Sequence, residues 1–246
     1  MTEQQFRILN NHIGYGNPQA EVVFIGLEEG CKHITLLDNY NYRFANNNEL
    51  LDLSEFHIHS PVPDMNHWFG AATSSQSTWG QYCKLLLMRD GAPFINANDK
   101  FNKLNYQLND LGSITGNSLL LELLPLPRPN HNFWDPFLDC PNLGINEYNY
   151  YACELLDDRI RRIRDLLVAR DRTVILHGKS KHQDALTLFN RILDPLVFVT
   201  DHALDGPIVA SEFSLTSNAN VRFLLTPFFG NGAMSNAAYE NLSHLM

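Results

Sequence analysis

The sequence lacks an apolar run long enough to cross a membrane. Its most apolar stretch, Ser118–Leu126, is far shorter than the ~20 residues that a bilayer requires, and it contains Glu122. The amino-terminal residues MTEQQFRILNN also lack the basic segment followed by an apolar segment that marks a signal peptide. From these absences we expect a cytoplasmic protein that does not associate with membranes.

Basic residues are scarce relative to acidic ones. The chain has 18 Lys and Arg against 27 Asp and Glu, which gives a net charge of -9 at pH 7. A protein with this balance is poorly suited to holding a long run of phosphates without regard to sequence. The charge excludes a high-affinity nucleic-acid coat, and it predicts that any contact with DNA is weak and sensitive to salt.

Cysteine is scarce too, and no two cysteines form a C-x-x-C pair. We expect four reduced thiols in or near the core, without zinc, an iron–sulfur cluster or another cofactor. The cysteines are Cys31, Cys83, Cys140 and Cys153. His57 and His59 would share a face if their segment were a strand, but no third ligand has matching spacing. We therefore expect no metal site.

Three familiar catalytic motifs are missing. The chain has no G-x-S-x-G nucleophile elbow, no G-x-G-x-x-G after its first apolar segment and no G-x-x-x-x-G-K-[ST] loop. These absences argue against an esterase of the α/β-hydrolase fold, a Rossmann dehydrogenase and a P-loop enzyme. What remains is a chain of 246 residues with 44% hydrophobic residues, enough for one large core. No stretch resembles a linker, so we expect a single domain over residues 1–246.

Short apolar segments alternate with amphipathic ones along the chain. The segments expected to be strands are 21–27, 118–124, 173–177, 196–200 and 221–226, with an edge strand or hairpin over 207–215. The segments expected to be helices are 3–12, 78–88, 99–111, 146–170, 181–193 and 235–245. Residues 31–72 suggest a long loop with short helices. The alternation predicts an α/β fold, a three-layer α/β/α sandwich with a mostly parallel central sheet.

Ligands bind at the carboxyl ends of the strands in open parallel sheets, which selects four loops. After the first strand, Glu28 and Glu29 lie between two glycines, where a carboxylate orients water or stabilises a cation. The alternative is a turn with solvated acids. Glu122 lies inside an apolar strand, where it either reads a ligand or has a structural role, for example as a partner of Arg128.

The other two loops carry groups suited to phosphates and bases. Gly178 is followed by Lys179 and Ser180, a pattern that contacts a phosphate at a helix start or simply forms a turn. After the last strand, Phe228 precedes a glycine-rich stretch with Asn231. An aromatic ring on such a loop stacks on a base or anchors the loop in the core.

Taken in order, these segments resemble the uracil-DNA glycosylase superfamily. The apolar strand and turn with acids resemble its first motif, and the later strands resemble those that carry its base-reading and Pro-containing motifs. The similar segments are Phe24–Gly30, Ser118–Leu124, Pro127–Asn130, Val174–Ser180 and Leu224–Pro227, and their order and spacing cover roughly residues 20–240.

The resemblance implies a DNA-repair glycosylase that holds a flipped base in a pocket and hydrolyses its N-glycosidic bond. Under it, Glu28, with its neighbour Glu29, positions the attacking water, and Thr226 lies where the family has a His. Glu122 would read the base, and Phe69 or Phe228 would stack on it. The implied phosphate contacts are Lys179, Ser180, Arg128 and Asn231.

Two residues depart from the family pattern. Glu122 replaces the Asn that reads uracil, and an ionised carboxylate accepts hydrogen bonds but donates none, so the substrate base need not be uracil. Thr226 replaces the His and carries no positive charge. An inactive module that binds a nucleobase, a nucleotide or a protein partner therefore stays open. So does an enzyme that uses Glu28, Glu29 and Glu122 around Mg²⁺ for phosphoryl chemistry.

Overall fold

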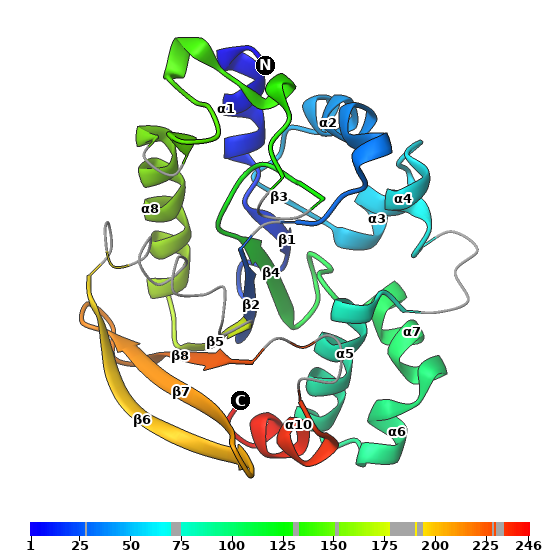
Figure 1. Cartoon of the computed structure of the whole chain (residues 1–246). Coiled ribbons are helices and arrows are strands. Elements are labelled where there is room, and N and C mark those ends of the chain that lie inside the picture. The colour runs from blue at the N-terminus through cyan, green and yellow to red at the C-terminus, as the bar shows by residue number, and fades with distance from the viewer. Residues whose placement is uncertain are drawn as a thin grey trace.

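The computed structural model describes residues 1–27, 29–69, 75–129, 133–150, 153–177, 190, 194–227, 229 and 234–246. Within this part of the chain, eight strands form one sheet in the order β3-β1-β4-β2-β5-β8-β7-β6 (Figure 1). The strands are β1 (Gly14–Gly16), β2 (Val22–Gly26), β3 (Leu50–Leu51), β4 (Ser118–Glu122), β5 (Arg172–His177), β6 (Leu196–Asp205), β7 (Ile208–Leu215) and β8 (Val221–Thr226). The predicted α/β class is confirmed.

The prediction of a mostly parallel sheet is wrong, because the sheet is mixed. The four central strands, β4, β2, β5 and β8, are parallel. On one side of them β1 pairs antiparallel with β4, and on the other β8, β7 and β6 pair antiparallel in succession. Short connections join β6 to β7 and β7 to β8, and a short connection permits only antiparallel neighbours. An apolar pattern does not reveal strand direction, which is why the sequence did not predict this.

Helices cover both faces of the sheet. One face packs against α1 (Glu3–Asn11), α2 (Leu36–Ala45) and α8 (Glu154–Val168). The other packs against α3 (Leu53–Ile58), α4 (Pro63–Asn66), α5 (Ser77–Arg89) and α10 (Asn236–Ser243), with α6 (Phe94–Asn98) and α7 (Lys100–Asn109) against α5. Short 3₁₀ turns cover 33–35, 136–138 and 141–143. The predicted helix over 181–193 lies outside the described residues, apart from residue 190.

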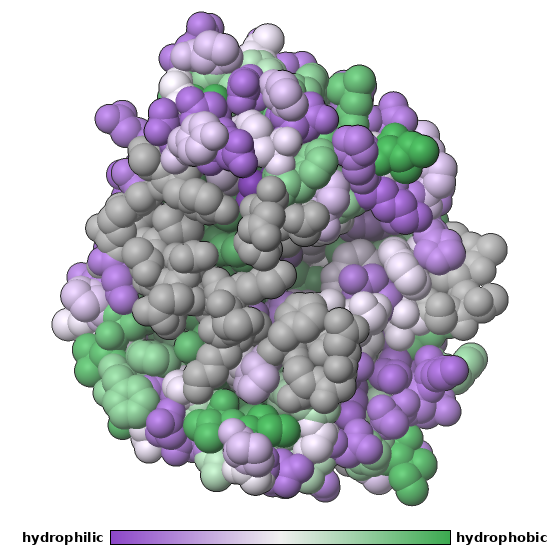
Figure 2. All heavy atoms as spheres, viewed as in Figure 1, coloured by the Kyte–Doolittle hydropathy of each residue, from purple (hydrophilic) through white to green (hydrophobic). Residues whose placement is uncertain are grey.

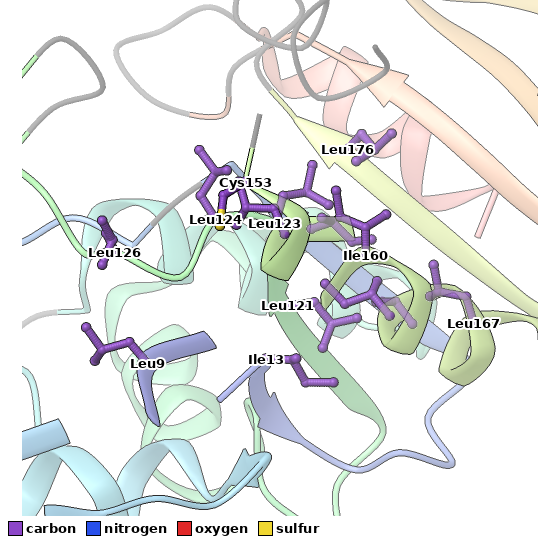
Figure 3. Packing of buried hydrophobic residues seen from close by; sticks show 14 of the residues in the cluster. Leu9, Ile13, Leu121, Leu123, Leu124, Leu126, Cys153, Ile160, Leu167 and Leu176 are labelled. Carbon is purple, nitrogen blue, oxygen red and sulfur yellow. The ribbon is translucent and has the colours of Figure 1, made fainter. Parts of the chain in front are cut away.

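Two apolar cores result from the alternation of side chains along the strands. In β2, Val23 and Ile25 face the core under α1 and α8, whereas Val22 and Phe24 face the core under α5 and α10. Figure 3 shows the first core, where leucines of β4 and β5 meet Ile160 of α8. Each fully buried aliphatic side chain contributes about 1.5–3 kcal/mol.

The sheet ends in an apolar edge. In β6, Val197, Phe198 and Val199 are about half exposed, and apolar side chains gather over β6 and β7 in Figure 2. Three cysteines are buried and Cys31 is partly exposed, and none of these four described residues forms a disulfide. Among the helices that the structure describes, none has the length and apolar character needed to span a bilayer.

Candidate functional site

The last residues of the four parallel strands lie at one edge of the sheet. Gly26 of β2 pairs in register with Glu122 of β4, and His177 of β5 pairs with Thr226 of β8. Since β2 and β5 are neighbours, these four residues follow one another across adjacent strands. This is the edge where parallel sheets bind their ligands.

Glu122 extends its carboxylate over Gly26. A Cβ atom added to Gly26 would lie 2.3 Å from Glu122 Oε2, so only glycine leaves room for this carboxylate. The Glu122 backbone is fixed on both sides, because its N–H donates to the Ile13 carbonyl at 3.1 Å and its carbonyl accepts from Arg159 Nη2 at 2.8 Å. The close fit of Glu122 and Gly26 is therefore built into the strand ends.

Arg159 of α8 joins several elements behind this edge. Its buried guanidinium donates to four backbone carbonyls, at distances from 2.5 to 3.0 Å. The carbonyls belong to Asn10, His12, Glu122 and Leu123. Burial lowers the pKa of Arg159 to about 9. This arginine therefore acts as a structural clamp between the end of α1 and the end of β4.

Tyr82 of α5 and His177 of β5 form a close polar pair. Tyr82 Oη lies 2.5 Å from His177 Nε2, and both residues are buried. Burial, and after it the negative charge of Glu122, raise the pKa of Tyr82 well above its ordinary value. Tyr82 therefore keeps its proton at neutral pH. Phe229 stacks on the His177 ring with centroids 5.1 Å apart. We call Glu122, Tyr82, His177 and Phe229 the Glu122 group.

Thr226 is fully buried beside this group. Its hydroxyl lies 3.3 Å from the Leu176 carbonyl and 3.2 Å from the Pro227 carbonyl. The single hydroxyl proton is therefore engaged by the backbone. Thr226 therefore lies at the predicted ligand-binding end of the sheet, but its hydroxyl donor is already used by the backbone.

A second polar group surrounds Glu29. Its carboxylate lies 2.8 Å from Arg43 Nη2 of α2, accepts from Tyr15 Oη of β1 at 3.0 Å and lies 3.6 Å from His57 Nε2 of α3. Burial raises the pKa of Glu29, but Arg43 and then His57 outweigh burial and hold it well below its usual range. Arg43 is buried, and the charge of Glu29 in turn raises its pKa. We call these four residues the Glu29 group.

The strand considered for the two histidines is a helix. His57 lies in α3 and its Nδ1 is 2.9 Å from the Leu53 carbonyl, whereas His59 is exposed at the helix end. Phe69, predicted to stack on a base, is buried and packs against His57 and Trp79 with centroids 5.4 and 5.5 Å apart. In this conformation its ring belongs to the core beside the Glu29 group.

Arg128, predicted to contact a phosphate, is also buried. Its guanidinium lies over the rings of Trp134 and Tyr150, and Nη1 donates to the Phe133 carbonyl at 3.3 Å. Its backbone continues the pairing of β2 with β4, since Arg128 N donates to the Glu29 carbonyl at 3.1 Å. Arg128 thus holds two of the predicted loops side by side.

Five predicted site residues lie outside the described residues: Glu28, Lys179, Ser180, Phe228 and Asn231. The structure also brings to this edge residues that were not predicted, among them His177, Tyr82 and Arg43. His177 ends the predicted strand over 173–177, and Tyr82 lies within the predicted helix over 78–88, so each had a weak signal. Arg43 lies in the segment 31–72, whose pattern carried none.

The described residues contain no cluster of three or more His, Cys, Asp or Glu that could hold a metal ion. Comparison with protein-family models, curated proteins and solved structures gives no match for the chain. Its function must therefore be argued from the geometry of the two polar groups.

Proposed function

We propose that this chain binds a nucleobase at the carboxyl ends of β2, β4, β5 and β8, and that it hydrolyses the N-glycosidic bond of a flipped, damaged or deaminated base in DNA. As part of this proposal, we assign the fold as a three-layer sandwich of the uracil-DNA glycosylase type. The observation that carries the proposal is the Glu122 carboxylate held in the space that Gly26 leaves open.

Among damaged or deaminated bases, the Glu122 group supports recognition of one that keeps an exocyclic amine. An ionised carboxylate only accepts hydrogen bonds, and it pairs with an exocyclic amine as glutamate does with cytosine N4. Tyr82 keeps its proton and supplies a donor next to that acceptor. The rings of Tyr82 and Phe229 add apolar surface on which a base packs.

The Glu29 group supports a division of labour between the two adjacent acids. Glu29 is ionised and neutralised by Arg43 at 2.8 Å, so it is a weak base and a poor activator of water. It instead anchors the chain after β2, and Glu28 immediately precedes it in the sequence. We assign to Glu28 the positioning of the attacking water, and to its charge the stabilisation of the positive charge that develops on the sugar.

A base-binding module without catalysis is the second candidate. The observation that favours it is Thr226, whose buried hydroxyl is engaged by backbone carbonyls and carries no positive charge for the departing base. Base release separates the two candidates, since only the hydrolase frees a base from DNA.

Two measurements test the proposal. Free cytosine, adenine, guanine, hypoxanthine and uracil are first compared as stabilisers in thermal unfolding, with Mg²⁺ alone as a further sample. We expect at least one amine-bearing base to raise the melting temperature, and Glu122→Gln to abolish that rise. The matched control is Glu55→Gln, which changes an exposed glutamate of α3. Stabilisation by Mg²⁺ alone would instead favour a phosphoryl enzyme.

Release of bases from oligonucleotides that carry deaminated or alkylated bases is the second measurement. We expect Glu28→Gln to slow release by at least a hundredfold, a typical contribution of general acid–base catalysis. Undiminished release by this variant would contradict the assignment of Glu28. Base binding without any release by the unmodified protein would establish the second candidate.

A further inference from the structure

Of the two buried titratable groups Tyr82 and His177, only Tyr82 has been given a role so far, in recognition. They come from different elements, α5 and β5, and are 95 residues apart in the chain, yet Tyr82 Oη lies 2.5 Å from His177 Nε2. A hydrogen bond between a phenol and an imidazole provides a path for a proton to pass from one to the other. The pair lies beside Glu122, whose charge acts on Tyr82.

Aromatic contacts hold both members of the pair. Phe24 of β2 stacks on Tyr82 with centroids 4.1 Å apart, and Phe229 stacks on His177 at 5.1 Å. Phe229 is held in turn by Tyr239 of α10, whose hydroxyl donates to the Phe229 carbonyl at 2.9 Å. The rings are therefore fixed before any ligand arrives, and little is lost in ordering them on binding.

The pair lies where a positively charged proton donor would serve the departing base, and Thr226 does not supply one. His177 and Thr226 are partners in the register of β5 and β8, so the imidazole lies on the strand next to Thr226. The Thr226 hydroxyl is engaged by two backbone carbonyls. An imidazole carries a positive charge when protonated, and a threonine does not.

We infer that Tyr82 and His177 form a relay that protonates the departing base, with Tyr82 as the donor to the base and His177 as the source of the proton. This inference rests on the proposed function. Because burial makes Tyr82 a very weak acid, it does not ionise alone, and its proton leaves only as His177 replaces it.

The step balances as follows. The bond between C1′ and the base nitrogen breaks, and its electron pair stays on the base. The base takes the Tyr82 hydroxyl proton while the Tyr82 oxygen takes the Nε2 proton of the His177 imidazolium, which becomes neutral. The water oxygen bonds to C1′, and its extra proton passes to the Glu28 carboxylate. His177 regains its proton from solvent.

The test compares the unmodified protein with Tyr82→Phe, His177→Gln and the control Tyr42→Phe, which also removes a tyrosine hydroxyl bonded to a backbone carbonyl. The probes are the five free bases named above, and their dissociation constants are measured by calorimetry across a pH series. Nitrogen NMR of the His177 ring gives its titration midpoint in the same samples.

We expect Tyr82→Phe to weaken binding of the tightest base about tenfold, the effect of one lost hydrogen bond to a buried polar group. We expect affinity in the unmodified protein to change with pH at the midpoint of the His177 titration, and to be independent of that pH range in His177→Gln. Tyr42→Phe should bind as the unmodified protein does.

Equal affinities and unchanged pH profiles in Tyr82→Phe and His177→Gln would overturn the relay while base binding itself stood. Failure of all five bases to bind the unmodified protein would overturn both the relay and the proposed function. If either variant unfolds, the unmodified protein still decides: a pH midpoint of binding that differs from the His177 titration contradicts the relay.

Discussion

The two polar groups at the carboxyl edge of the sheet differ in how their charges are balanced. In the Glu29 group a partly buried carboxylate and a buried guanidinium are 2.8 Å apart, and a tyrosine hydroxyl and an imidazole also face the carboxylate. In the Glu122 group a carboxylate lies over a glycine, next to a tyrosine and a histidine. The first arrangement fixes a loop, and the second holds groups able to exchange protons.

An acid that is largely shielded from water near a strand end, as Glu29 is, is not by itself a catalytic acid. Arg43 neutralises Glu29 and lowers its pKa, which removes its basicity. The Glu122 group keeps Tyr82 protonated by burial and charge. We therefore expect substitutions in the Glu29 group to change stability, and substitutions in the Glu122 group to change binding.

The largest expected effect is that of Arg43→Met. It leaves the Glu29 carboxylate buried without its cation, and removal of one member of a buried ion pair costs about 3–5 kcal/mol. Urea unfolding at pH 7 measures the loss. The double variant Arg43→Met with Glu29→Gln is the control, since it removes the stranded charge and should recover part of the stability. A loss of unfolding free energy below about 1 kcal/mol for Arg43→Met would contradict a stabilising role for the Arg43–Glu29 ion pair.

Gly26→Ala should have the opposite effect: a small change in stability and a large loss of base affinity. Its Cβ would lie 2.3 Å from Glu122 Oε2, so the carboxylate must move, which the end of a flexible side chain does at small cost. We expect a change in unfolding free energy below about 1 kcal/mol and at least a tenfold loss of base affinity, about 1.4 kcal/mol. The control is Gly80→Ala in α5, outside the two groups, where the added Cβ would likewise meet the end of a side chain, Ser75 Oγ at 2.6 Å. Unchanged affinity would remove Glu122 from the site.

The stability of the fold in mild acid should depend on His12. Burial, and next the positive charge of Arg43, lower the pKa of His12 from 6.5 to about 3. Because the unfolded chain binds this proton more readily, the stabilisation is complete above pH 6.5 and declines as the pH falls toward 3. Between pH 6.5 and 4.5 His12 acts before Glu29, whose stabilising contribution is lost only below its ordinary value of 4.5.

Chemical unfolding at half-unit steps across this window measures the effect. In His12→Gln we expect a flatter dependence of stability on pH between 6.5 and 4.5. His59→Gln, which changes an exposed imidazole, is the control and should keep the slope of the unmodified protein. Identical slopes in all three proteins would contradict the assignment to His12.

The smallest effect is expected at Lys84, outside both groups. Its ammonium lies over the rings of Tyr239 and Phe94 at 4.1 and 4.6 Å and donates to Asn236 Oδ1, and burial lowers its pKa to about 8. Its folded-state pKa is below its ordinary 10.5, so stability rises as the pH increases from 8 to 10.5. Lys84→Met should reduce this rise, measured by thermal unfolding, and an undiminished rise would assign it to other groups.

The sequence predicts the central strands well because they are buried on both faces and appear as continuous apolar runs. Segments 118–124 and 221–226 correspond closely to β4 and β8. It did not predict β1, whose three residues Gly14–Gly16 have no apolar pattern, or the second half of β6, which extends beyond the predicted segment 196–200 to Asp205. A short strand is stabilised by its pairing with neighbouring strands, and a local sequence pattern does not contain that information.

Helix boundaries show a similar limit. The predicted helix over 146–170 begins only at Glu154, because the Asn146 side chain accepts from the N–H groups of Tyr148 and Asn149 and forms a turn instead. The site depends on still longer separations. Tyr82 and His177 meet across 95 residues, and no spacing rule relates Arg43 to Glu29.

The position of a bound base tests the central claim most directly. Crystals soaked with the amine-bearing base that stabilises the protein most should show it at the ends of β2 and β4, with its amine within hydrogen-bond distance of Glu122 and a ring atom within reach of Tyr82 Oη. A base bound elsewhere on the molecule, or one that contacts neither Glu122 nor Tyr82, would contradict the account.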